Sequence, residues 1–144
     1  MYGTAGKIHA YTVKVGYLDN PLGDRRVIDS TDEWEDYARL MSKPVYDGQG
    51  NVTLVRPKGL KGYDQEFFAT GNRLVATYQI LSSGSYSPSV ISCDVDERTG
   101  ILVIEYKRDG RPGMALTMDM SGFIIVAEIP AGVSFDDIEV SLVP

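Results

Sequence analysis

Residues 123–129 constrain the fold more than any other part of the chain, because they are apolar on both faces apart from Glu128. A strand with this pattern must be covered on both sides, so it has to lie in the middle of a sheet. Ser121-Gly122 joins it to an alternating segment that begins at Gly113. We therefore expect the rest of the chain to supply strands beside this segment and a layer on each of its faces.

Alternation of polar and apolar residues marks the other predicted strands: 8–18, 74–80, 91–95, 102–106, 114–120 and 138–142. This spacing, interrupted by Gly and Asp turns, is typical of an antiparallel meander. We predict a mostly β (α+β) protein, with a twisted antiparallel sheet of about six to eight strands closed as a sandwich or partial barrel. Residues 45–62 are rich in Gly and Pro, so we expect a loop there, with a short strand at 52–55.

Two signals predict helices. Ser30 and Glu33 form a capping box, in which the Ser30 hydroxyl accepts from the Glu33 amide. The apolar residues that follow share one helical face: Trp34, Tyr37, Ala38 and Met41. They predict an amphipathic helix near 31–42. Asp64 is the predicted N-cap of a short helical turn near 64–69.

Length and charge bound the class of protein. The chain has 144 residues, which suits one domain spanning 1–144. Its net charge of −6 argues against nucleic acid and against an anionic membrane surface, because both need clustered Lys and Arg. Cys93 is the only cysteine, so no disulfide closes within the chain. No run reaches the roughly 18 apolar residues of a membrane span.

Several short runs, taken in order, resemble the protease-complex-subunit-B C-terminal-like family. They are TMDMSGF at 117–123 followed by Glu128 and Pro130, YDQEFF at 63–68, and SGS at 83–85. The resemblance covers about residues 27–130. It implies a bacterial domain that is exported or lipid-anchored, as an accessory subunit associated with a surface protease. Most members of that family have no known activity.

The resemblance also bears on location. We expect the protein to be extracytoplasmic, at the cell surface or in the periplasm, after removal of a signal that this chain does not contain. A cytoplasmic location is the alternative, because a reduced cytosolic protein and a disulfide-free secreted one have the same cysteine content.

The residues that carry chemistry are few. His9 and Cys93 are each single, and a Cys-His nucleophile needs them within hydrogen-bond reach. The alternation turns Cys93 inward, so we expect a core thiol and a surface imidazole. Zinc needs three or four ligands. Asp94, Asp96 and Glu97 lack the EF-hand pattern and are interpreted as solvated hairpin charges. We therefore predict no catalytic residue, no metal site and no cofactor.

Four residues are the candidate binding site. Ser83, Ser85 and Tyr86 lie in a long polar loop, and tyrosine among Ser and Gly is good contact material, although a plain hairpin loop explains the same pattern. Asp119 lies within the resemblance. It is a polar anchor at a binding surface, an outward strand residue, or a residue that bonds backbone amides at the Ser121-Gly122 turn.

The prediction is a non-enzymatic exported interaction or accessory domain, with a protease or another cell-envelope protein as the possible partner. The alternative is a binding module for a sugar or peptide that uses Tyr11, Tyr78 or Trp34 in a groove. An enzyme that uses carboxylates alone would need two of them facing across a cleft.

Overall fold

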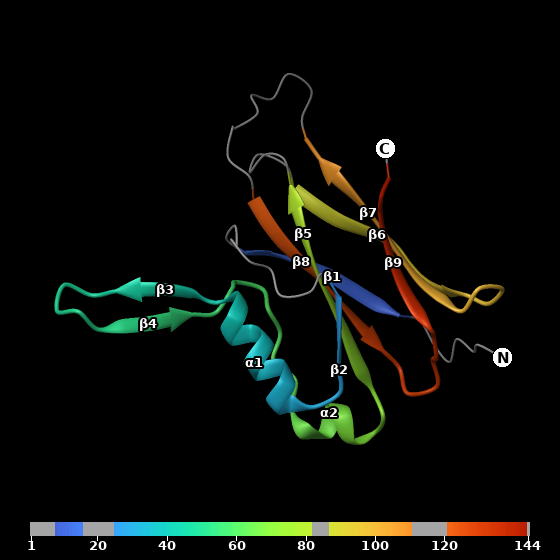
Figure 1. Cartoon of the computed structure of the whole chain (residues 1–144), viewed down its shortest axis with the longest axis horizontal. Helices are drawn as coiled ribbons and strands as arrows, with labels where there is room; N and C mark the ends of the chain where they lie inside the picture. Colours follow the sequence, from blue (N-terminus) through green and yellow to red (C-terminus); the bar gives the residue numbers. More distant parts are fainter. Residues whose placement is uncertain (1–7, 16–24, 82–86, 111–120, 144) are drawn as a thin grey trace.

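The computed structural model describes residues 8–15, 25–81, 87–110 and 121–143 (Figure 1). The elements follow in the order β1 (His9–Val15), β2 (Arg25–Ile28), α1 (Thr31–Met41), β3 (Lys43–Tyr46), β4 (Val52–Val55), α2 (Gln65–Ala69), β5 (Arg73–Leu81), β6 (Ser87–Asp96), β7 (Ile101–Asp109), β8 (Ser121–Ile129) and β9 (Asp137–Leu142). The predicted mostly β, α+β architecture is confirmed. It is a sandwich rather than a closed barrel.

The main sheet has the strand order β1-β8-β5-β2, and all of its pairs are antiparallel. β8 therefore has a strand on each side along its length, with Ile125 opposite both Thr12 of β1 and Thr77 of β5. This confirms that residues 123–129 form an interior strand. The second sheet has the order β6-β7-β9, and β9 runs parallel to β7.

The meander predicted from 74 onward is wrong in its pairing. Although β6 and β7 form the expected hairpin around 96–100, β5 pairs with β2 and β8 instead of β6. The physical reason is that β5 is buried on both faces from Leu74 to Tyr78, so it needs a place in the middle of the main sheet. The predicted strand at 114–120 lies outside the described residues.

Two apolar clusters cover the two faces of β8. Phe123, Ile125, Ala127 and Ile129 face the second sheet, where they pack with residues such as Leu102 and Ile104. Ile124 and Val126 face the opposite way, toward the layer that contains α1. The molecule thus has a helical layer, the main sheet and the second sheet, and the main sheet is covered on both sides.

The helices begin where the sequence predicts. The Ser30 hydroxyl accepts from the Glu33 amide at 3.2 Å, and the Asp64 carboxylate accepts from the Phe67 amide at 3.1 Å. The predicted apolar face of α1 is the buried one: Trp34, Tyr37, Ala38 and Met41. The Trp34 indole also donates to the Lys61 carbonyl at 3.1 Å, which ties α1 to the segment before α2.

The two sheets are linked at both of their lateral edges. On one side, the Thr12 hydroxyl of β1 donates to the Pro88 carbonyl of β6 at 3.1 Å. On the other, the Arg25 guanidinium of β2 donates to the Ile138 carbonyl of β9. No helix in the described part of the chain is long and apolar enough to span a membrane.

Gly71 offers a test of the packing between α2 and the end of β8. Its φ is +95°, and a Cβ there would lie 3.1 Å from the Ala131 Cβ. We expect Gly71→Ala to lower the free energy of unfolding by about 2 kcal/mol, because the left-handed backbone and the close contact both oppose a side chain. Urea denaturation measures this effect.

Gly48→Ala is the matched control, because no atom lies within 4 Å of a Cβ at that position and its φ is not in the positive range. It should leave the unfolding midpoint unchanged. Equal effects of the two substitutions would contradict the packing described at Gly71.

Candidate interaction surfaces

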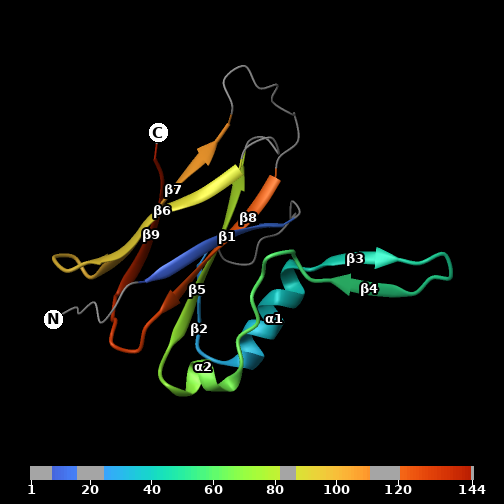
Figure 2. The same cartoon turned by 180° about the vertical axis from the view of Figure 1, so that it is seen from behind.

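The β3–β4 hairpin forms an arm that projects from the body of the molecule (Figures 1 and 2). Every residue of both strands is exposed, and neither strand contributes to the two apolar clusters. The prediction of a strand at 52–55 is confirmed, whereas its partner strand β3 was not predicted, and its residues 45–46 were expected to be loop. A two-stranded hairpin is at best marginally stable alone in water, so an arm of this kind gains stability when another surface covers it.

One face of the arm is entirely apolar. The strands pair so that Pro44 lies opposite Leu54, and Tyr46 lies opposite Val52. Directly opposed residues share a face, so these four side chains form one surface, which we call the apolar arm face. Tyr46 is 69% exposed, Val52 53% and Leu54 48%. The other face is mixed: Lys43, Val45, Thr53 and Val55.

The turn at the tip of the arm is held by Asp47. Its carboxylate accepts from the backbone amides of Gln49 at 2.8 Å and Asn51 at 2.9 Å, and from the Asn51 side-chain amide at 3.0 Å. These bonds, led by the Asn51 amide, hold the pKa of the Asp47 carboxyl below its ordinary value. Gly50 completes the turn at φ 86°. The arm therefore carries a fixed negative charge at its tip.

A hollow of about 260 Å³ lies where the arm joins α1. Leu54 of the apolar arm face lines it, with Arg56 beside it and Arg39 on the helix. Arg56 is bound to Glu35 at 2.8 Å, and both side chains stay substantially exposed. Arg39 is likewise paired with Asp36 at 3.0 Å, and Glu35 also lines the hollow. The apolar arm face therefore runs directly into a hollow with two guanidinium groups, each paired with a carboxylate of α1.

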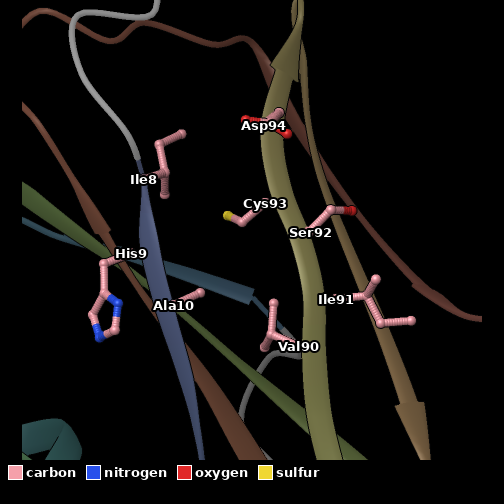
Figure 3. Close-up of a pocket in the computed structure, with 8 residues that line it drawn as sticks. All are labelled: Ile8, His9, Ala10, Val90, Ile91, Ser92, Cys93 and Asp94. Carbon is pink, nitrogen blue, oxygen red and sulfur yellow. The ribbon is translucent and has the colours of Figure 1, made fainter.

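A larger groove, of about 430 Å³, separates β1 from β6 (Figure 3). Within the described residues, each of these strands pairs with another strand on one side only, and the two facing edges are joined by the bond from Thr12 to Pro88 rather than by a strand ladder. Ile8, Ala10 and Val90 line it together with Cys93. A break in register between Val90 and Ser92 leaves Ile91 51% exposed at its rim.

Cys93 and His9 do not form a pair. In Figure 3 the Cys93 sulfur points between the sheets, whereas the His9 ring lies on the opposite side of β1. Burial raises the pKa of the Cys93 thiol to about 12, so it is protonated at neutral pH. His9 is exposed and stacks on Tyr11, with ring centroids 6.0 Å apart. The predicted core thiol and surface imidazole are both confirmed.

A cluster of polar side chains, which the sequence analysis did not predict, joins β1, β8 and the segment before α2. The Tyr63 hydroxyl donates to the Glu128 carboxylate at 2.6 Å and lies 2.9 Å from the Tyr11 hydroxyl. The Lys61 ammonium is 3.4 Å from the same carboxylate and 5.0 Å from the centre of the Tyr11 ring. Burial, followed by the Glu128 hydrogen bond, raises the pKa of Tyr63. The sequence feature that could have indicated this cluster is Glu128, the one acidic residue in the apolar strand 123–129.

The candidate residues Ser83, Ser85, Tyr86 and Asp119 all lie outside the described residues, so they stay predictions. Trp34 and Tyr78, named for a ligand groove, are 0% and 3% exposed and belong to the core under α1. The interpretation of Asp94, Asp96 and Glu97 as solvated hairpin charges is confirmed, because all three are exposed, and Asp96 also accepts from the Arg98 amide at 2.9 Å. The described residues contain no group of three or more His, Cys, Asp or Glu placed to hold a metal.

Comparison of the chain with protein-family models, curated proteins and solved structures gives no match. The resemblance to the protease-complex-subunit-B C-terminal-like family therefore stays a prediction.

Burial of the Cys93 thiol predicts low reactivity. In the folded protein at about pH 8, it should not react with a thiol reagent on the timescale on which exposed cysteines react. The control is Gln49→Cys in a Cys93→Ala background, which places a thiol at the exposed tip of the arm and should react at once. Rapid modification of Cys93 under native conditions would contradict the burial described.

The same thiol predicts a pH dependence. Its pKa is raised in the fold from 9.0 to about 12, so the neutral form stabilises the native state fully below pH 9, and this contribution is lost as the pH rises to about 12. Cys93→Ala should therefore reduce the fall in the free energy of unfolding over this range. Urea titrations at a series of pH values measure this fall. If the free energy of unfolding falls equally with pH in the wild type and in Cys93→Ala, the assignment is contradicted.

Tyr63→Phe tests the cluster of polar side chains. It removes the donor to Glu128 and should lower the free energy of unfolding by about 1–2 kcal/mol, because a partly buried carboxylate loses a charged hydrogen bond. Tyr46→Phe is the matched control on the exposed arm and should have no effect on the unfolding midpoint. Equal midpoints for both variants would show that the bond does not stabilise the fold.

Proposed function

We propose that this protein is a non-enzymatic interaction domain and that the β3–β4 arm is the element that contacts its partner. The observation that carries the proposal is the apolar arm face, whose residues are all exposed and belong to no core cluster. Exposed apolar residues are ordinary when they are scattered, but a continuous set on a projecting element marks an interaction site.

The arm is built to present this face. The Asp47 turn holds the two strands together at the tip, and the base continues directly from α1, whose buried side anchors it to the main sheet. The hairpin is thus preorganised at both ends, which reduces the conformational entropy that binding has to overcome. A purely structural role would place these apolar residues against the body of the protein.

The chemistry of the remaining residues fits a binding role. The lone histidine and cysteine lie on opposite sides of β1, and the Cys93 thiol is protonated. The family resemblance adds the proposal that the domain works outside the cytoplasm, in association with a protease or another protein of the cell envelope.

Photo-crosslinking tests the contact role of the arm. With p-benzoylphenylalanine in place of Tyr46, the proposal expects a discrete protein adduct in the native cell. The same group in place of Thr53, on the opposite face, should give little adduct. Leu54→Asp should abolish the Tyr46 adduct because it places a charge in the contact surface. If Tyr46 gives no protein adduct, the proposal fails.

A second candidate is the binding of an extended peptide in the groove between β1 and β6. The apolar lining favours it, together with two strand edges that pair with no other strand of the described residues, because a peptide strand can bond to an edge and place alternate side chains in the groove. Titration with apolar peptides should then protect β1 amides from hydrogen exchange in the wild type. It should not protect them in Ala10→Arg, which fills the groove.

A further inference from the structure

The arm has a charge at each end, and the two charges are opposite. Asp47 lies at the tip, whereas Lys43, Arg56 and Lys58 lie at the base or just after it, and Arg56 is paired there with Glu35. The apolar arm face lies between these ends. An arm with this order of charges and apolar surface is complementary to a second copy that lies antiparallel to it. The acidic tip of each arm then meets the positively charged end of the other.

The hollow at the base supplies the place for the tip. It is continuous with the apolar arm face through Leu54, and its charged lining is Arg39, Arg56 and Glu35, which gives it one net positive charge. A second arm lying antiparallel over the face would bring its Tyr46 and Asp47 to this hollow. The aromatic ring would then be covered, and the carboxylate would reach the two guanidinium groups that Asp36 and Glu35 pair with in the single chain, so that it would share or exchange these ion pairs.

We infer that the partner of the arm is the arm of a second copy of this chain, packed face to face and antiparallel about a two-fold axis. This inference rests on the proposed function, since it names the partner of the same surface. A two-fold arrangement makes every contact twice, so four apolar residues become a core of eight. It also leaves the groove between β1 and β6 free.

The size of the contact sets the expected affinity. The arm together with the helix residues at its base offers fewer residues than the roughly 20–30 per partner of a standard interface. We therefore expect a reversible dimer that forms in the micromolar range, rather than an obligate one. The monomer keeps both apolar clusters, because neither includes an arm residue.

Sedimentation equilibrium of the full chain tests the inference. The wild type should associate reversibly to a dimer, and Leu54→Asp should raise the dimer dissociation constant by about 100-fold or more, since the change acts twice across the axis. Thr53→Asp, which adds the same charge on the opposite face, should dimerise like the wild type. Circular dichroism and unfolding midpoints should show that both variants stay folded.

Disulfide trapping tests the antiparallel orientation independently of Leu54. In a Cys93→Ala background, chains with Gln49→Cys are mixed with chains that carry Arg39→Cys. Tip-to-base disulfides should form faster than tip-to-tip ones. Predominant tip-to-tip disulfides would overturn the antiparallel arrangement.

The outcomes separate this inference from the proposed function. A wild type that stays monomeric up to millimolar concentration, while Tyr46 still crosslinks to another protein, overturns the inference and leaves the proposed function standing. A monomer without any arm adduct overturns both. A dimer that Leu54→Asp leaves intact overturns the inference, because the contact then lies on another surface.

Discussion

The burial of β8 on both faces is the constraint on which the rest of the structure depends. Its side chains alternate between the layer of the second sheet and the layer of α1, and from Phe123 to Ala127 they are fully buried. A strand of this kind leaves water only if neighbours pair both of its edges and layers cover both of its faces. β1 and β5 pair its two edges, and the sheet β6-β7-β9 and the helical layer cover its two faces.

Glu128 is the exception within this strand, and it shows how the helical layer is fastened. An acidic residue at the end of an apolar strand is tolerable only with partners, and Tyr63 and Lys61 provide them. Tyr63 itself packs against Trp34, with ring centroids 5.2 Å apart, and against Phe67 at 4.7 Å. The carboxylate thus joins the sheet to both helices through one aromatic side chain.

The sequence predicts which face of a helix or strand is buried better than it predicts which strands pair. The apolar pattern of 123–129 indicates an interior strand, and the residues from Ser30 to Met41 specify a helix start and its buried side, because both signals are local. Strand order is not local. β9 joins β7 in parallel after the chain has passed through β8, and alternation in β9 says nothing about this. β5 likewise shows alternation in sequence, yet Val75 and Thr77 are buried on its second face.

The arm was hidden for a different reason. Pro44 and the glycines around Asp47 are loop signals, so only β4 was expected, and exposed apolar residues look the same in a sequence as core residues. The contact of Tyr63 with Glu128 joins residues 65 positions apart, and only the fold brings them together. The contact residues proposed from composition, such as Tyr86, lie outside the described residues.

The protein has a stable two-sided core and an arm, held by the Asp47 turn, that a second surface stabilises further. Hydrogen exchange of the backbone amides, measured over a range of protein concentrations, tests both parts together. The prediction is slow exchange in β8 and β5 at every concentration, with exchange in β3 and β4 that is fast in dilute solution and slows as the concentration rises. Arm amides that exchange as slowly as those of β8 in dilute solution would contradict it.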